Sequence, residues 1–266
     1  MLTLLGHELY FEWHHVKSEY TGFFKSLFNR FLKSKKLLGS IAITQALQSK
    51  LVEKGIGHAR IQVLPDAAAP PTTSDAKFDT AVFKVGYLGH LYPGKGMEII
   101  QHLPGALNEV EFHIVGGRKE DVDKWKSKLS FNNLFFHGHV APGEISSYLN
   151  SFDCCLLPNQ NEVKTYAGRG MDIGAFTSPL KLFDYLSHGK AIVSSDLTVL
   201  REVLHEEMAI FCHPSRPEEW VEAIKQLIAD PRKKERLGKT NRQAYIDQYS
   251  WYQRAEKLIS WIKSKR

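Results

Sequence analysis

The chain has 266 residues, of which 43% are hydrophobic, so it can bury the core of one large domain or two small ones. Lysine and arginine number 35 against 29 aspartates and glutamates, a net charge of +6 that favours anionic partners without choosing among phosphates, nucleic acid and acidic lipid. The three cysteines stand in apolar runs without paired spacing, which indicates buried thiols and excludes a disulfide framework. No apolar run has the length of a membrane span, and the first residues lack the pattern of a signal peptide. We therefore expect a cytoplasmic protein, with peripheral contact at the inner face of the membrane left open.

Residues 1–65 are predicted to hold only a few elements. The runs 9–13 and 40–44 have the composition of strands, and amphipathic helices are expected around 21–36 and after residue 44. These elements are too few for a complete doubly wound domain. Residues 66–80 are rich in proline, alanine, serine and threonine and have no apolar period, so they are predicted to form a linker.

From residue 81 onward, short β-rich runs alternate with amphipathic segments, which is typical of a parallel sheet covered by helices on both faces. The fold class predicted for 81–249 is therefore α/β, a doubly wound Rossmann-like parallel sheet, followed by a closing helix over 250–266. The expected strands are 84–88, 111–115, 134–140, 153–157, 191–195 and 210–213.

The longest interval between these strands, 158–190, ends in a helix with clear terminal signals. Ser178 is expected as the N-cap, Pro179 as the first helical residue, and Gly189 just past the end. This helix would begin at the edge where open α/β sheets bind ligands, and a cation in its first turn is misplaced unless an anion binds there. Lys181 in that turn therefore predicts a phosphate site, against the alternative of an ordinary surface lysine.

A second signal for an anion follows the strand 84–88, in the sequence GYLGHLYPGKG. Gly89, Gly94 and Gly96 would let the backbone approach a ligand, and Lys95 supplies positive charge. The segment has neither the G-x-G-x-x-G pattern nor that of a Walker loop. On its own it is more typical of an ordinary turn.

Four segments in order resemble the nucleotide-binding domain of GT-B glycosyltransferases of the family-4-like group. They are VGYLGHLYPGKG (85–96), HIVGG (113–117), FFHGHV (135–140) and SPLKLFDYLSHGKAIV (178–193). The resemblance covers about residues 40–266 of the sequence. It implies that 81–249 bind a nucleotide-sugar, and that 1–65 are the remnant of an N-terminal, acceptor-side Rossmann-like domain that is otherwise largely absent.

The resemblance also implies a set of donor-binding residues. In the family, an arginine and a lysine after the first strand bind the pyrophosphate, and here His90 and Lys95 stand at their positions. Two glutamates contact the sugar and the ribose, and here those positions are Phe176 and Asp184, although members with S-P-L-K commonly lack the first glutamate. Val140 would lie beside the nucleobase. The complete set is Gly89, His90, Lys95, Val140, Ser178, Pro179, Leu180, Lys181 and Asp184.

The activity implied by the resemblance is hexosyl transfer from a UDP- or GDP-sugar to a glycan, lipid or other acceptor. Retention of configuration is expected, with no metal and no cofactor besides the donor. No catalytic residue follows, since His14 and His15 match a later strand end rather than the family's catalytic histidine. Two alternatives stay open: a non-catalytic nucleotide-sugar-binding module or inactive remnant, and another enzyme with the GT-B fold, such as a sugar-nucleotide epimerase.

Three further signals each allow an ordinary structural interpretation. His137 and His139 alternate on a strand and could share a metal, but no third ligand is near in sequence. Asp121 and Asp123 form a D-x-D pattern, but their charged helical surroundings favour a solvated face. The helix around 21–36 has an apolar stripe beside lysines, which fits a core helix or a membrane-surface helix. If the stripe is uncovered, a complementary N-terminal subunit, a second copy or an anionic membrane is the expected partner, and nucleic acid is not.

Overall fold

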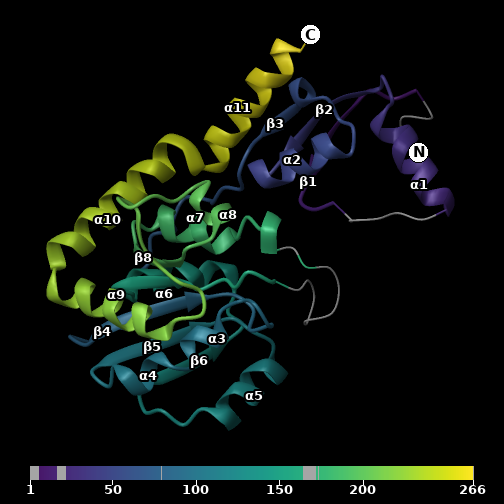
Figure 1. Ribbon diagram of the computed structural model, residues 1–266. Helices are drawn as coiled ribbons and strands as arrows, with labels where there is room; N and C mark the ends of the chain where they lie inside the picture. The colour runs from purple at the N-terminus through teal and green to yellow at the C-terminus, as the bar shows by residue number, and fades with distance from the viewer. Residues whose placement is uncertain (1–5, 17–21, 79, 164–171, 173, 266) are drawn as a thin grey trace.

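Two parallel sheets follow one another along the chain (Figure 1). The structure is a computed structural model that describes residues 6–16, 22–78, 80–163, 172 and 174–265. The first sheet has the order β1-β2-β3, and α1 and α2 pack on it around a small core that contains Trp13, Leu32 and Leu47. The bounds of these elements are β1 Leu9–Trp13, α1 Gly22–Leu32, β2 Leu37–Ala42, α2 Gln45–Glu53, η2 His58–Arg60 and β3 Ile61–Val63.

The second sheet has six parallel strands in the order β6-β5-β4-β7-β8-β9. Because β4 is the first of the six along the chain and lies in the middle, the strand order reverses between β4 and β7, as in Rossmann folds. This confirms the α/β, doubly wound Rossmann-like sheet, and every expected strand is present close to its predicted bounds. The strands are β4 Phe83–Leu88, β5 Val110–Val115, β6 Leu134–Gly138, β7 Cys154–Leu157, β8 Ala191–Ser195 and β9 Ala209–Cys212.

Helices cover both faces of this second sheet. Their bounds are α3 Met97–Ile100, α4 Leu103–Ala106, α5 Lys119–Lys128, η3 Pro142–Glu144, α6 Ile145–Ser151, η4 Gly174–Phe176, α7 Leu180–Ser187, α8 Thr198–Arg201, α9 Pro217–Ala229 and α10 Pro231–Ala244. In the strands other than β6, residues on opposite faces belong to two separate cores. The core on one face includes Trp220 of α9, and the core on the other includes Phe183 of α7. The three cysteines are free thiols buried in these cores, as predicted.

The C-terminal helices join the two sheets (Figure 1). α10 packs on α7 and β8, a π-helical turn follows (η5, Tyr245–Tyr249), and α11 (Trp251–Ser264) then runs along the first sheet. Trp261 of α11 meets Tyr10 edge to face, with ring centroids 5.6 Å apart. The guanidinium of Arg254 donates to Glu12 and to the carbonyl of Pro65. The closing helix is therefore anchored on the first sheet.

Between the two sheets, the described residues form no helix or strand beyond a single bridge, yet this segment is held along α6. The N–H of Thr72 donates to the Ser146 hydroxyl, and the N–H of Phe78 donates to the Ser151 hydroxyl. The ring of Phe78 stacks on His113, with centroids 4.5 Å apart. These contacts were not predicted, because the composition of a segment does not identify its tertiary partners.

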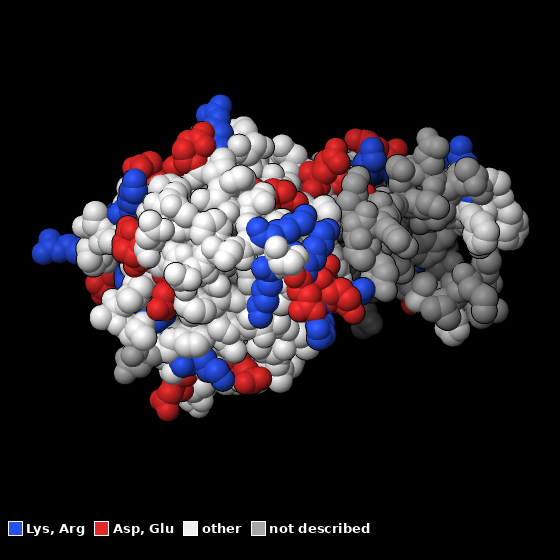
Figure 2. All heavy atoms as spheres, turned by 90° about the horizontal axis from the view of Figure 1, so that it is seen from below, with Lys and Arg blue, Asp and Glu red and all other residues white. Residues whose placement is uncertain are grey.

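None of the described helices is both long and apolar enough to cross a lipid bilayer. Figure 2 shows the molecule from below, the side on which α5 lies in Figure 1. Lysines and arginines gather near the middle of this face, directly beside a group of acidic side chains. On this face, the described basic residues therefore do not form the one-sign surface that is typical of nucleic-acid-binding proteins.

Candidate functional site

A cleft of about 650 Å³ opens at the carboxyl ends of β4, β5 and β6, with residues of α5 and α7 on its walls. It lies beside the reversal of strand order, where the loops of an open α/β sheet diverge to opposite faces and leave room for a ligand. The predicted donor-binding residues that line it are Gly89, His90, Val140, Lys181 and Asp184.

Lys181 brings an unpaired positive charge to this cleft. Its Nζ is shielded from solvent and has no hydrogen-bond partner among the described residues. The ammonium lies 3.8 Å from the centroid of the Tyr87 ring, and a Cβ added to Gly89 would stand 3.2 Å from Nζ. Burial lowers the pKa of Lys181 well below its ordinary value, and the charge of Lys95 lowers it further. A bound anion would supply the missing partner.

Other basic side chains crowd the same place. Burial lowers the pKa of His90, and the charges of Lys95, Arg118 and Lys181 add to this effect, while Asp121 acts in the opposite direction. Burial also lowers the pKa of Lys95. Like charges held together in a partly dry site repel one another, and an anion among them removes that repulsion. The electrostatics of the cleft therefore favour a ligand with more than one negative charge.

Tyr87 shapes the loop 89–96 that forms one wall of the cleft. Its hydroxyl oxygen lies 2.7 and 2.9 Å from the carbonyl oxygens of His90 and Lys95, which share its one hydrogen. Burial raises the pKa of Tyr87, so the phenol stays a neutral donor. The two residues at the positions of the family's pyrophosphate ligands are thus held by one buried side chain.

Gly94 and Gly96 have a packing role in this loop. Their N–H groups donate to the carboxylate of Glu98, at 2.7 and 3.1 Å. Both have positive φ angles, and a Cβ on either would collide with atoms of the segment 158–163. Three glycines were expected to bring the backbone close to a ligand, but Gly89 alone lines the cleft. Gly94 and Gly96 instead bring the backbone close to residues 158–163.

α7 begins one residue later than the sequence predicts. Its N-cap is Pro179, with ψ at 116°, so the prediction of Ser178 as N-cap is wrong. A residue before proline is held extended, and Ser178 therefore precedes the cap, too far back to accept from the N–H groups of the first turn. Leu180 is 58% exposed. Of the predicted residues 178–181, Lys181 alone lines the cleft, and Lys95 acts on it through its charge.

Asp184 lies one turn further along α7 and lines the same cleft. Burial raises the pKa of its carboxyl group to about 6. Among the described residues no basic side chain forms an ion pair with it. A carboxyl group in a cleft whose pKa is raised by burial is typical of a binding position.

Phe176, at the position of the family's sugar-binding glutamate, packs on the first sheet rather than lining the cleft. It contacts the core around Leu47. Nearby, the carboxylate of Glu202, next to α8, accepts the N–H groups of Gln45 and Ala46 at the start of α2, at 2.5 and 3.0 Å. This position therefore serves the contact between the two halves of the molecule.

His137 is hydrogen-bonded to a buried histidine and not to His139. Its Nε2 lies 3.0 Å from Nδ1 of His113, and Nε2 of His113 lies 3.2 Å from Glu111. His113 is 3% exposed. Burial lowers the pKa of His113, and it lowers that of His137 to about 4.

The D-x-D pair lies on α5, and its two carboxylates have different surroundings. Asp123 is exposed and pairs with Lys119 at 2.6 Å, as a solvated face predicts. Asp121 is partly buried, and one of its oxygens has no hydrogen-bond partner among the described residues. The interpretation as a solvated face therefore holds for Asp123 and not for Asp121.

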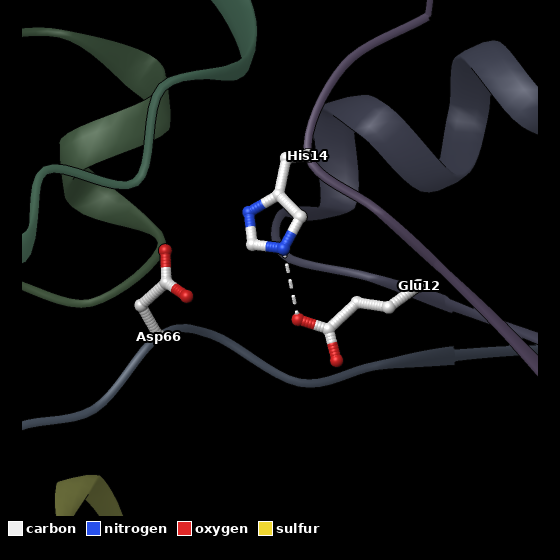
Figure 3. Close-up of side chains that lie close together, drawn as sticks. All are labelled: Glu12, His14 and Asp66. Carbon is white, nitrogen blue, oxygen red and sulfur yellow. Dashed lines mark ion pairs between the residues drawn. The ribbon is translucent and has the colours of Figure 1, made fainter.

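Within the described ranges, one group of three side chains could hold a metal ion, and it lies at the first sheet. Glu12, His14 and Asp66 place possible ligand atoms within 4.8 Å of one another, and Nε2 of His14 lies 3.1 Å from Glu12 (Figure 3). Glu12 also accepts from Arg254 at 2.9 Å. Asp66 is 5% exposed, and burial raises its pKa. Arg254 therefore balances one of the two carboxylates of this group.

Arg118 is a cleft residue that the sequence analysis missed. It follows β5 together with Gly116 and Gly117, and all three line the cleft. Gly116 has φ of 113°, and a Cβ there would collide with the backbone of Gly89. A glycine pair and an arginine at the carboxyl end of a strand are the same kind of anion-binding pattern as the glycines and lysine of the loop 89–96. This pattern could have identified Arg118 from the sequence.

Residues 82–230, more than half of the chain, match the family of glycosyl transferases group 1. The chain belongs to this family of sugar-transferring enzymes. No curated protein sequence matches it.

Solved structures share the fold of the chain at low sequence identity. A glycosyltransferase from Rickettsia africae aligns with TM-score 0.75 and 13% identity, over 96% of this chain and 70% of the other. The Anabaena protein HepE, solved with UDP and glucose, aligns with 0.73 and 15%, over 99% and 73%. Sucrose-phosphate synthase from Thermosynechococcus elongatus aligns with 0.71 and 16%, over 96% and 67%. The resemblance to GT-B glycosyltransferases is thereby confirmed at the level of the fold.

Proposed function

We propose that the chain is a retaining, metal-independent glycosyltransferase that takes a hexosyl group from a UDP- or GDP-sugar bound in the cleft beside β4, β5 and β6. Membership of the glycosyl transferases group 1 family supports the reaction class. The presence of UDP and glucose in the similar structure of HepE supports the kind of donor.

The observation that carries the proposal is the shielded ammonium of Lys181, which has no hydrogen-bond partner among the residues that the structure describes. It lies in the first turn of α7, where the helix dipole also favours an anion. Lys95 and Arg118 add charge at the same place. A nucleoside diphosphate brings the several negative charges that this arrangement lacks.

The same geometry supports a role in bond breaking as well as binding. Negative charge grows on the diphosphate as the bond from the sugar to the phosphate oxygen breaks, and preorganised cations in a dry site stabilise it. Asp184 would accept hydrogen bonds from the ribose hydroxyls, and Val140 would lie beside the base. We assign acceptor binding to residues 1–65 and donor binding to residues 81–249. Residues 66–80 link these two parts, and the helix over 250–266 packs back from the second part onto the first.

The experiment is a release assay with UDP-glucose or a GDP-hexose and a mixture of acceptors, run with and without EDTA. We expect nucleotide release that EDTA does not reduce and that Lys181→Met abolishes. NMR of the product should show the anomeric configuration of the donor. Tight binding without release would identify a non-catalytic nucleotide-sugar-binding module, and neither binding nor release would refute the proposed donor site.

A further inference from the structure

Three polar side chains form a hydrogen-bonded line that ends at the cleft. Glu111 and His113 lie two residues apart on β5, and His137 on β6 pairs with His113 and lines the cleft. The proposed donor site uses none of the three.

Each hydrogen bond in this line can have only one direction, because each neutral imidazole has one N–H to donate and one nitrogen that accepts. Burial keeps both histidines neutral at neutral pH, so each carries one N–H. Ionised Glu111 can only accept, and therefore Nε2 of His113 is the protonated nitrogen of that ring. Its Nδ1 must then accept from Nε2 of His137. The Nδ1 of His137 is left without a proton, and none of the described residues pairs with it.

Aromatic rings hold the two imidazoles in place. Phe78 and Phe135 stack on His113, with centroids 4.5 and 5.0 Å away. The ring of Tyr148 lies 5.0 Å from that of His137. The planes of the two imidazole rings are within 8° of parallel and their centroids are 5.2 Å apart, which is compatible with a hydrogen bond between their edges. The line is therefore rigid, and His137 cannot easily exchange the roles of its two nitrogens.

We propose that His137 is a base-specificity residue, whose unprotonated Nδ1 accepts a hydrogen bond from the nucleobase, and that Glu111 and His113 are the positioning residues that keep it unprotonated. The inference rests on the proposed function, because it requires a nucleotide in this cleft with its base near the end of β6. Its ligand class is a base with a ring N–H, such as uracil or guanine.

The affinities for UDP and CDP distinguish a hydrogen bond to Nδ1 of His137 from stacking of the base alone. Uracil carries a hydrogen on N3, whereas cytosine has a lone pair there that would face the lone pair of His137 Nδ1. The two bases have the same ring shape, so stacking and sterics change little between them. One lost hydrogen bond in a buried site predicts that UDP binds about tenfold more tightly than CDP.

The binding test uses the full chain and calorimetry with UDP and CDP. His137→Leu should bind both nucleotides with similar affinity, and His137→Asn, which can turn either a donor or an acceptor to the base, should also lose most of the preference. Glu111→Met removes the acceptor that holds the proton of His113 on Nε2, so this proton can move to Nδ1 of the same ring. We therefore expect a smaller preference for UDP, although residue 111 does not contact the nucleotide. Glu109→Met removes an exposed carboxylate just before β5 and should leave the preference unchanged.

A second measurement does not depend on nucleotide binding. Nitrogen-15 NMR of the unliganded chain reports which imidazole nitrogens carry protons, and we expect an unprotonated Nδ1 in His137 of the wild type and a shift in tautomer in Glu111→Met. A protonated Nδ1, or equal affinity of the wild type for UDP and CDP, would overturn the inference. If neither nucleotide binds while the tautomer is as expected, the proposed function has failed and the base-recognition role fails with it.

Discussion

Lys181 is expected to favour the binding of an anion but to lower the stability of the fold when no anion is bound. Its charge is shielded from water and lies over the face of Tyr87, without a hydrogen-bond partner among the described residues, so in the absence of an anion this charge destabilises the fold. Lys181→Met keeps the length of the side chain and removes the charge. We expect this variant to unfold at a higher temperature than the unliganded wild type while losing the stabilisation that UDP or GDP gives.

Thermal unfolding with and without nucleotide measures both effects. Lys225→Met, on the exposed face of α9 where Lys225 pairs with Glu222, is the matched control and should change neither. A Lys181→Met chain that is less stable than the wild type and still responds to nucleotide would contradict this account of the residue.

Asp184 makes a prediction about pH. Its pKa of about 6 in the folded chain lies above the ordinary value of 3.8, so the folded state binds this proton more tightly than the unfolded state. Ionised Asp184 therefore destabilises the fold, fully so above about pH 6 and hardly at all below about pH 4. Asp184→Asn should raise the free energy of unfolding by about 2 kcal/mol at neutral pH, and the gain should vanish on acidification.

The same substitution should weaken nucleotide binding. Loss of a charged acceptor for the ribose hydroxyls is expected to cost about 1–3 kcal/mol at neutral pH. Calorimetry with ribo- and 2′,3′-dideoxynucleotides distinguishes this role, because the dideoxy ligand should bind the wild type and the variant alike. Equal affinity of the wild type for both ligands would remove Asp184 from the ribose site.

At the scale of elements, α2 depends on a cap supplied from the other half of the molecule. Glu202 accepts two N–H groups of its first turn, in addition to the cap from Thr44 within the chain segment itself. Glu202→Ala should lower the free energy of unfolding by about 1 kcal/mol and speed hydrogen exchange in the first turn of α2. Exposed Glu207 offers the control. Unchanged exchange in Glu202→Ala would show that the contact contributes nothing in solution.

The elements of the second sheet could be predicted because their apolar periods are long and regular. β3 was missed, since a run of three residues has no period to detect. The start of α7 was misplaced because a serine before proline has the composition of a cap but not its backbone. Lys181 and Asp184 were found from local signals and the family resemblance. The packing of Phe176 and the line from Glu111 to His137 depend on contacts between distant segments, which local patterns do not encode.

At the scale of the whole molecule, α1 leaves two large apolar side chains uncovered. Phe23 and Phe24 are 76% and 68% exposed, whereas Phe28 and Phe31 further along the helix pack against the core of the first sheet. The predicted stripe is therefore part core and part surface. Lys25 follows the two exposed rings in the sequence, and a basic residue next to exposed apolar rings fits an anionic lipid surface.

We accordingly expect the chain to bind anionic vesicles, more weakly as salt rises. Replacing Phe23 and Phe24 together with serine should weaken binding about tenfold or more. The control replaces Val52 and Val82, two other exposed apolar residues, with serine. Light scattering after size exclusion will show whether the chain instead associates with itself. A monomer that ignores the vesicles would count against this surface as a site of association.

We expect the cleft to bind a nucleoside diphosphate through Lys181 and Lys95. Calorimetric titration of UDP, GDP and ADP into the metal-free chain and into two double variants measures this binding. Lys95→Ala with Lys181→Ala removes the proposed ligands, and Lys225→Ala with Lys239→Ala removes two lysines that form exposed ion pairs on α9 and α10. The account predicts that UDP or GDP binds the wild type and the second variant equally and does not bind the first. Binding of the same nucleotide to the first variant as tightly as to the wild type would contradict it.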